Sequence, residues 1–147
     1  MLSYRHGFHA GNHADVLKHV CLINCYKILK RMHKSINYID THSGNGLYSY
    51  NDEFMIKKRE YLNGIEKLLK SNSKSSLINN YLKTIININK SKKLSFYPGS
   101  PIIMSYLSDN NDKLFFYELH SNEIKILKKN LSNNTNLKIF NTNGFNF

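Results

Sequence analysis

The chain has 147 residues, of which 41% are hydrophobic, and this is enough for one globular domain with a buried core. It contains no apolar run that could span a bilayer, and its N-terminal sequence MLSYRHGFHAGNH is not that of a signal peptide, so we expect a cytoplasmic protein with no membrane partner. The formal net charge of +11, from 21 Lys and Arg against 10 Asp and Glu, favours a polyanionic partner, most simply a nucleic acid.

A polar arm without periodicity precedes the first predicted helix and carries Tyr4, Arg5, His6 and His9. One interpretation of this arm is a frayed terminus. The other is an arm that contacts a nucleic-acid substrate, in which Tyr4 stacks on a base and Arg5 meets a phosphate.

The first predicted helix starts after Asn12 and continues to about Met32. Asn12 is a favoured N-cap residue, and Asp15, three positions later, is a short-armed partner for a capping box. Apolar residues recur with helical periodicity and form a broad face: Val16, Leu17, Val20, Ile23, Ile28, Leu29 and Met32. Lys18 and His19 lie beside this face near the helix start, where free N–H groups and the positive end of the helix dipole are found.

Histidines and cysteines near the N-terminus do not form a usual metal motif. The four histidines of this region are His6, His9, His13 and His19. Their spacing matches no common zinc site and no C-x-x-C pair accompanies them, so we predict no metal. Cys21 and Cys25, four residues apart on the predicted helix, are typical of two small core residues in a reducing compartment.

The chain is organised around residues 36–48, which read I-N-Y-I-D-T-H-S-G-N-G-L-Y. A short apolar strand ends near Asp40, and a tight turn over 43–46 completes the pattern D-x-x-x-G-x-G. Gly44 and Gly46 permit a positive φ and a close approach of a ligand to the backbone. In an open α/β sheet this turn lies at the carboxyl edge of the strands, where small ligands bind, so the pattern predicts a nucleotide-like site.

Residues 48–95 differ in character and predict a small helical insertion. One amphipathic helix is predicted over 59–70 and a second over 76–89. An insertion is expected because a Rossmann-type unit has an acidic residue about 20 residues after its glycine turn, and the candidate here lies much further along. The predicted organisation is an arm, first helix and first strand in 1–47, the insertion, and the second part of the same domain in 96–147.

The region after the insertion starts with a turn and a helix. Phe96 and Tyr97 lead into a turn at 98–99. Ser100 is then predicted to be the N-cap of a helix, with Pro101 at its first position.

Two further strands are predicted to end at the same sheet edge. The strand over 113–120 is nearly continuous in apolar residues, as expected for a strand covered on both faces. Glu118 near its end indicates an acceptor for ribose hydroxyls or, alternatively, a strand-end salt bridge. Ser121 is predicted to cap the next helix, and a third strand over 137–140 precedes the turn at 143–144.

These motifs resemble those of the RlmJ-type bacterial methyltransferases. The matching segments, in family order, are LSYRHGFHAGNHADVLKH, DTHSGNGLY, YPGSP, ELH and NGF. The resemblance covers essentially the whole chain and the N-terminal half of the family's sequence. It implies a class I S-adenosylmethionine-dependent methyltransferase fold, which is α/β and Rossmann-like, and N6-methylation of an adenine in 23S ribosomal RNA.

The resemblance also implies site residues, with S-adenosylmethionine as cofactor and 23S ribosomal RNA as partner. The family's cofactor contacts correspond to His19, His42, Ser100, Glu118, Asn143 and Gly144. The turn at Gly44 and Gly46 is expected to let the methionine portion approach the backbone, Glu118 to accept from the ribose hydroxyls, and Asn143 to meet the adenine edge. The substrate side is implied to be lined by Tyr4, His6 and Lys18.

The sequence departs from the family pattern at two places. Asn143 stands where the family has Asp; an amide oxygen still accepts a hydrogen bond but carries no charge, so we expect cofactor binding weaker by ~1 kcal/mol. The family's catalytic D-P-P-Y motif, which holds the target amino group and stacks the flipped adenine, is absent from this chain, whose prolines are Pro98 and Pro101. We therefore predict no catalytic acceptor here. The alternative function is that of a catalytically inactive remnant that binds RNA or S-adenosylmethionine only.

The strand order of the implied fold has a consequence for stability and partners. In the class I order 3-2-1-4, a fold truncated after the third strand leaves the first strand as a sheet edge with unpaired backbone groups. We expect marginal stability and self-association, or association with another polypeptide, through this edge. A dinucleotide-dependent oxidoreductase would share the strand, turn and helix, but the chain lacks the complete G-x-G-x-x-G and a hydride site.

Overall fold

The computed structural model describes residues 6–146, and the chain packs into two compact units. The first unit combines Met1–Asn24 with Tyr48–Tyr97, and the second combines Cys25–Leu47 with Pro98–Phe147. The predicted division into arm, insertion and second part stays a prediction. Within residues 6–146, no helix is both long enough and apolar enough to cross a membrane.

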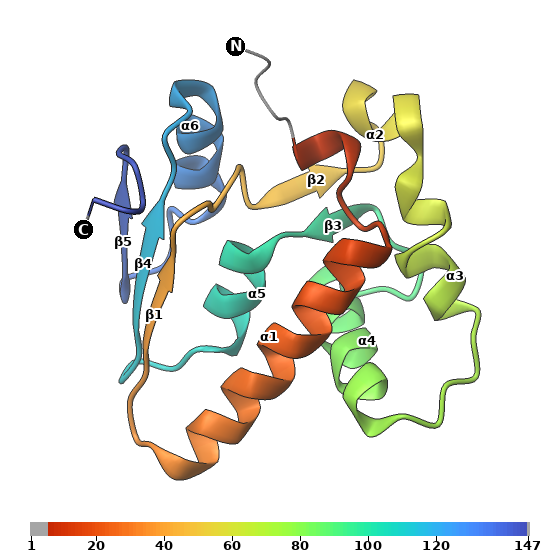
Figure 1. Cartoon of the computed structure of the whole chain (residues 1–147), viewed down its shortest axis with the longest axis horizontal. Coiled ribbons are helices and arrows are strands. Elements are labelled where there is room, and N and C mark those ends of the chain that lie inside the picture. The colour runs from red at the N-terminus through yellow and green to blue at the C-terminus, as the bar shows by residue number, and fades with distance from the viewer. Residues whose placement is uncertain (1–5, 147) are drawn as a thin grey trace. The chain divides into compact units, whose positions relative to one another are not determined.

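The second unit contains a parallel sheet with the strand order β1-β4-β5 (Figure 1). These strands are β1 (Asn37–Asp40), β4 (Lys113–Tyr117) and β5 (Leu137–Phe140). Their register pairs Tyr38 with Leu114, and Leu114 with Leu137. In the described part of the chain β1 is thus an edge strand, as the strand order predicts. Because all three strands run in one direction, their carboxyl ends meet at one edge of the sheet.

Two helices and the end of a third complete this unit: α5 (Ser100–Leu107), α6 (Ser121–Asn130) and the C-terminal part of α1 (His13–Met32). Its buried apolar side chains are Tyr26, Ile103, Met104, Leu114, Phe116, Ile124, Leu127 and Leu131. Along β4, burial alternates with partial exposure. The expectation of a strand covered on both faces is therefore wrong for the described residues. The uninterrupted apolar run in the sequence gives no sign of this alternation.

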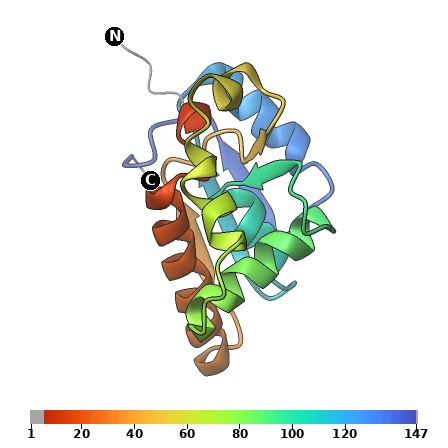
Figure 2. The same ribbon diagram turned by 90° about the vertical axis from the view of Figure 1, so that its right-hand side faces the viewer.

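The first unit contains the N-terminal part of α1 and several short elements. These are η1 (His6–Phe8), α2 (Glu53–Lys58), η2 (Glu60–Leu62), α3 (Ile65–Leu69), α4 (Ser76–Asn89) and a two-stranded sheet of β2 (Leu47–Ser49) and β3 (Phe96–Pro98). Figure 2 shows α4 beside this part of α1, where the Asn24 side-chain amide donates to the Leu77 carbonyl at 3.1 Å. The buried apolar side chains here are Ala10, Ile23, Tyr48, Met55, Ile65, Tyr81, Ile85, Leu94 and Tyr97.

The predicted helix over 76–89 is confirmed as α4, but the predicted helix over 59–70 is wrong. Arg59 has a φ of 50° and ends α2 in the left-handed conformation, and the chain resumes as η2 and α3. Gly64 separates these two elements. A Cβ at Gly64 would lie 2.0 Å from the carbonyl oxygen of Gly11, so the chain here is set by close tertiary packing. The apolar periodicity of the segment contains no sign of this break.

Two predicted helix caps are also wrong. The N-cap of α5 is Gly99, and the Ser100 side chain makes no capping hydrogen bond. The N-cap of α6 is His120, whose Nδ1 accepts from the backbone nitrogen of Asn122 at 3.3 Å. In both cases the serine is the first residue of the helix, so its hydroxyl does not cap the helix.

The outer face of α1 is more exposed than the sequence predicts. Cys21 and Cys25 are free thiols on the surface, so their expected burial in the core is wrong. Leu17, Ile28 and Met32 are also exposed, Met32 by 71%. These residues follow helical periodicity, but in the described residues that face of α1 is not buried.

Candidate functional site

The carboxyl edge of the parallel sheet brings three separate segments of the second unit together. The Ser43 nitrogen donates to the Tyr117 carbonyl at 3.0 Å, and the Glu118 nitrogen donates to the Phe140 carbonyl at 3.1 Å. These two hydrogen bonds extend the strand pairing beyond the ends of the strands. They place the turn after β1 beside the end of β4, and the end of β4 beside the residues that follow β5.

The carboxylate of Glu118 holds the glycine turn. Its Oε2 accepts from the Gly44 backbone nitrogen at 2.8 Å, and its Oε1 accepts from the His120 backbone nitrogen at 2.7 Å. Gly44 has a φ of 61°, a conformation that glycine adopts without steric cost. Each carboxylate oxygen can accept more than one hydrogen bond, so the half-buried Glu118 keeps acceptor capacity for a ligand hydroxyl.

A second carboxylate, Asp40 at the end of β1, holds the start of α5. The Ser100 hydroxyl donates to Asp40 Oδ2 at 2.6 Å, and the Tyr38 hydroxyl donates to the same oxygen at 3.2 Å. The His42 nitrogen donates to Oδ1 at 3.1 Å. Burial, together with the charge of Asp40, raises the pKa of Tyr38, so this phenol remains protonated and continues to donate. Ser100 thus joins α5 to the sheet edge, which is the role that replaces its predicted cap.

The turn after β5 packs directly on the turn after β1. A Cβ at Gly144 would lie 2.3 Å from the carbonyl oxygen of Thr41, so glycine alone permits this approach. The Asn143 side-chain oxygen accepts from the Phe145 nitrogen at 3.0 Å. The rings of Phe145 and His42 meet edge to face, with centroids 5.2 Å apart, and Phe145 is 71% exposed. Phe145 is not among the site residues predicted from the sequence, although it follows the N-G turn directly.

Gly46, the second glycine of the turn, packs closely against α6 in the same unit. Its φ is 77°, and a Cβ there would lie 2.9 Å from Leu127 Cδ1 on α6. Its carbonyl accepts from the Gly99 nitrogen at 2.8 Å. Of the two glycines in the turn, Gly44 therefore contacts the Glu118 carboxylate, whereas Gly46 permits close packing of the turn on α6.

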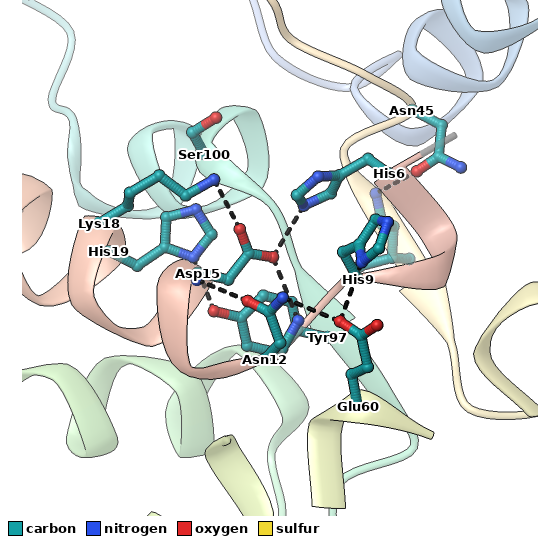
Figure 3. A network of polar contacts seen from close by, with 12 residues as sticks. His6, His9, Asn12, Asp15, Lys18, His19, Asn45, Glu60, Tyr97 and Ser100 are labelled. Carbon is teal, nitrogen blue, oxygen red and sulfur yellow. Dashed lines mark hydrogen bonds and ion pairs between the residues drawn. The ribbon is translucent and has the colours of Figure 1, made fainter. Parts of the chain in front are cut away.

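The first unit contains a separate polar network around Asp15 (Figure 3). Asp15 is 1% exposed, yet its carboxylate contacts His6 Nε2 at 2.7 Å, Lys18 Nζ at 2.7 Å and the Gly11 nitrogen at 3.1 Å. Burial alone would raise the pKa of Asp15, but the hydrogen bond from His6, the charges of His6 and His19, and the hydrogen bond from Lys18 hold it well below its usual range. Asp15 is therefore a buried anion held by an ion pair with Lys18 and a hydrogen bond with His6.

The predicted N-cap of α1 is confirmed, but the predicted capping box is not formed. Asn12 Oδ1 accepts from the Asp15 nitrogen at 3.0 Å, as expected of a cap. The Asp15 carboxylate does not return to the cap residue; it accepts from the Gly11 nitrogen and contacts the side chains of His6 and Lys18. An acid three residues after Asn12 fits a capping box on spacing alone, so the sequence does not predict these contacts of Asp15.

A second carboxylate, Glu60 of η2, holds the arm next to α1. Its Oε2 contacts His9 Nδ1 at 2.9 Å and accepts from the Asn12 side-chain amide at 3.0 Å (Figure 3). Hydrogen bonding from Asn12 lowers the pKa of Glu60, burial opposes this shift, and hydrogen bonding from His9 adds to the lowering. The sequence contains no local signal for this contact, because Glu60 is 48 residues from Asn12.

His19 is buried behind this network. Its Nδ1 lies 2.8 Å from the Tyr97 hydroxyl, which in turn lies 3.2 Å from the Tyr81 hydroxyl. Burial lowers the pKa of His19 to about 4, although the charge of Asp15 opposes the shift. The imidazole is therefore neutral near pH 7, with a ring position fixed by Tyr97.

The structure thus groups the predicted site residues in two places. The second unit brings His42, Ser100, Glu118, Asn143, Gly144, Gly44 and Gly46 to or near one sheet edge. The first unit brings His6 and Lys18 onto one carboxylate, with His19 close by. Tyr4 lies outside the described residues. Among residues 6–146, no group of three or more His, Cys, Asp or Glu side chains could hold a metal ion.

A sequence model of the family described as "Ribosomal RNA large subunit methyltransferase D, RlmJ" matches residues 33–147, which is most of the chain. The chain belongs to the RlmJ family. It is 37% identical over 145 residues to "Ribosomal RNA large subunit methyltransferase J" of Escherichia coli K12, and 41% identical over 146 residues to the protein of the same name from Haemophilus influenzae Rd.

The solved structures place this RlmJ-family chain in the same fold. A crystal structure of a Legionella pneumophila protein of family DUF519 matches with a TM-score of 0.81 and 35% identity, over 92% of this chain and 49% of that one. The match confirms the predicted Rossmann-like α/β fold of a class I methyltransferase. Each curated relative is covered over 52% of its own length by 99% of this chain, so the chain spans about half of those proteins.

Proposed function

We propose that this RlmJ-family chain takes part in the S-adenosylmethionine-dependent N6-methylation of an adenine in 23S ribosomal RNA. Its part in that reaction is to bind the cofactor at the carboxyl edge of β1, β4 and β5 and to contact the RNA with the arm at the start of α1. The observation that carries the proposal is the meeting of the Gly44 turn, Glu118 and Gly144 at one sheet edge, in a member of a family whose named relatives are ribosomal RNA methyltransferases.

The residues at the sheet edge fit S-adenosylmethionine chemically. Glu118 retains acceptor capacity for ribose hydroxyls, and Asn143 presents an amide next to the exposed ring of Phe145, which offers an apolar surface for a purine. The cofactor supplies a methyl group activated by its sulfonium. The chain's own contribution is orientation: Glu118 holds the glycine turn, and Asp40 holds Ser100, before any ligand arrives.

Charge supports an RNA substrate for the arm. The chain has a net charge of +11, and His6 and Lys18 are gathered on one buried carboxylate at the start of α1. Basic side chains that contact phosphates position a protein on RNA, whereas sequence is recognised through the bases. We assign Tyr4, His6 and Lys18 to the substrate side.

Transfer also needs a group that accepts and aligns the target amine, and the 147 residues contain no D-P-P-Y. We therefore expect this chain to bind S-adenosylmethionine and RNA without turning over by itself. The alternative is a remnant that binds RNA or S-adenosylmethionine and never takes part in transfer.

Two measurements test the proposal. Calorimetry is expected to show one S-adenosylmethionine site per chain, and absence of binding contradicts the proposal. Labelled S-adenosylmethionine and unmodified 23S ribosomal RNA are then incubated with the chain, with or without a polypeptide that carries the remaining half of the Haemophilus influenzae relative. Methyl transfer that needs both pieces supports the proposal. Binding without transfer in either mixture favours the inactive remnant.

We also propose that the chain associates through β1. This strand is at the sheet edge in the described part of the molecule, and Ile39 on it is 45% exposed. An edge strand with exposed apolar side chains presents free backbone donors and acceptors to another strand. The partner is a second copy of this chain or a polypeptide that continues the sheet.

A further inference from the structure

Two basic side chains of the first unit, His6 and Lys18, contact a single buried anion. Asp15 Oδ2 contacts His6 and Asp15 Oδ1 contacts Lys18, each at 2.7 Å. The His6 and Lys18 side chains are 23% and 62% exposed, whereas the Asp15 side chain is 1% exposed. The side chains of His6 and Lys18 therefore both reach solvent while each contacts the same buried carboxylate, which sets the positions of both.

A second carboxylate, that of Glu60, fixes the backbone between His6 and Lys18. Glu60 contacts His9 and Asn12, and the Gly11 nitrogen between these residues donates to Asp15. The His9 carbonyl also accepts from the Asn12 nitrogen at 3.0 Å. The arm is thus held on both sides, by Asp15 from α1 and by Glu60 from the segment between residues 48 and 95.

We propose that Asp15 and Glu60 are positioning residues that fix the RNA-facing arm, and that the segment carrying Glu60 takes part in RNA recognition through this contact. The inference rests on the proposed function, because it takes His6 and Lys18 as contacts to RNA. Recognition of the polyanionic RNA by this strongly basic chain then depends on two acidic residues, Asp15 and Glu60.

The physical reason is that long cationic side chains lose rotamer freedom when they bind RNA. Lys18 held on Asp15 has already lost part of that freedom, so less is lost on binding. Asp15→Asn keeps the shape of the side chain but removes the charge that pairs with Lys18 and places an amide N–H against either Lys18 or His6. The variant therefore weakens the hold on these side chains while raising the net charge of the chain by one.

This charge change separates positioning from simple attraction. If the arm were an unstructured source of positive charge, Asp15→Asn would strengthen binding to every RNA. If Asp15 positions the arm, the variant loses preference for the correct RNA while its general affinity for RNA is kept or rises. A fall in the preference of Asp15→Asn for the correct RNA indicates positioning, and an unchanged preference indicates simple charge attraction.

The experiment measures affinity of the 147-residue chain for an unmodified 23S ribosomal RNA transcript and for a 16S ribosomal RNA transcript, at one fixed salt concentration. Asp15→Asn and Glu60→Gln are compared with Glu53→Gln, which makes the same charge change at an exposed position of the first unit. The 23S-to-16S affinity ratio is expected to fall at least tenfold in Asp15→Asn and at least threefold in Glu60→Gln, and to stay unchanged in Glu53→Gln.

Thermal melts accompany the binding data, because Asp15 is buried. If Asp15→Asn does not fold, the half-exposed Glu60→Gln decides the result. A folded Glu60→Gln and a folded Asp15→Asn that both keep the wild-type ratio overturn the inference and leave the proposed function intact. A wild-type chain without preference for 23S RNA overturns the proposed substrate, and the inference falls with it.

Discussion

The carboxylate of Glu118 accepts the backbone N–H of Gly44 across the sheet edge, at 2.8 Å. Two segments 74 residues apart in the chain are thereby joined at the point where the strands end. The contact gives Glu118 two roles, since the group expected to bind the ribose also fixes the turn beside it.

Glu118→Gln is expected to weaken both folding and cofactor binding. In glutamine the NH₂ group that replaces one carboxylate oxygen cannot accept from the Gly44 or His120 nitrogen, so one of these backbone donors loses its acceptor and the other keeps only a neutral oxygen. We expect the free energy of unfolding to fall by about 1–3 kcal/mol and the S-adenosylmethionine Kd to rise at least tenfold. Urea titration and calorimetry measure the two effects. Glu53→Gln, an exposed acid, is the control, and a variant with wild-type values in both assays contradicts this role.

Ser100→Ala tests the contact between α5 and the sheet edge. The Ser100 hydroxyl donates to Asp40 at 2.6 Å, so its removal is expected to cost about 1–2 kcal/mol of unfolding free energy. Ser105 on the same helix is a matched control, because its hydroxyl is buried without a hydrogen-bond partner in the described residues. Ser105→Ala is expected to be neutral or stabilising. Equal losses in the two variants, measured by chemical denaturation, would show that the Asp40 contact contributes nothing.

Acid is expected to destabilise the fold through His19. Its pKa is about 4 in the folded chain against 6.5 for the ordinary side chain, so the folded state binds fewer protons between these values and stability falls as the pH falls. We expect the free energy of unfolding to drop by about 2 kcal/mol between pH 7 and pH 5. Denaturation curves at several pH values measure this drop.

Replacement of His19 identifies the source of that pH dependence. His19→Gln is expected to flatten the dependence between pH 7 and pH 5. The exposed His33 provides a control, and His33→Gln is expected to retain the wild-type slope. A His19→Gln chain that is as acid-sensitive as the wild type would assign the effect to other groups.

Asn143→Asp introduces the acidic residue that the resemblance to the family implies at this position. The Asn143 oxygen already accepts from the Phe145 nitrogen at 3.0 Å, and a carboxylate keeps that acceptor while adding charge. We expect S-adenosylmethionine to bind about fivefold more tightly, equivalent to ~1 kcal/mol. Calorimetry checks the change. Phe145→Ala, which removes the exposed ring, is expected to weaken binding, and a tighter Phe145→Ala complex would contradict the proposed purine surface.

Ile39→Lys tests association through β1. A lysine on an edge strand disfavours pairing with another strand, because pairing would bring charge against the partner. We expect the wild-type chain to show concentration-dependent self-association in light scattering, and Ile39→Lys to shift it towards the monomer. A wild-type chain that stays monomeric at every concentration counts against self-association. Cys21→Lys, an exposed change on α1, controls for added charge.

The elements that could be predicted from the sequence are those with local signals. The helix α4 has a regular apolar face over four turns, and α1 has a good cap at Asn12. The parallel strands β1, β4 and β5 are short, but each has an apolar run and a turn or polar residue at its end. The small sheet of β2 and β3 was missed, because three-residue strands are too short to show a period.

The remaining errors concern contacts between residues far apart in the chain. A serine before a proline predicts a cap at Ser100, but the partner of its hydroxyl is Asp40, 60 residues away. Asp15 fits a capping box on spacing alone. The break at Arg59 depends on how the next segment packs against Gly11, which no window of sequence contains. The positions of the candidate site residues could be predicted, but their partners could not.

The absence of a side chain at Gly64 limits how this protein can vary. Any larger residue there would collide with the Gly11 carbonyl, and the Ile65 nitrogen that follows donates to the same carbonyl at 3.0 Å. A substitution at Gly64 is therefore expected to displace Gly11 and, through it, the arm that carries His6 and His9. In a mutational scan of the whole gene, Gly64 is expected to rank with the arm residues in its intolerance to exchange, while the neighbouring Asn63 tolerates many replacements.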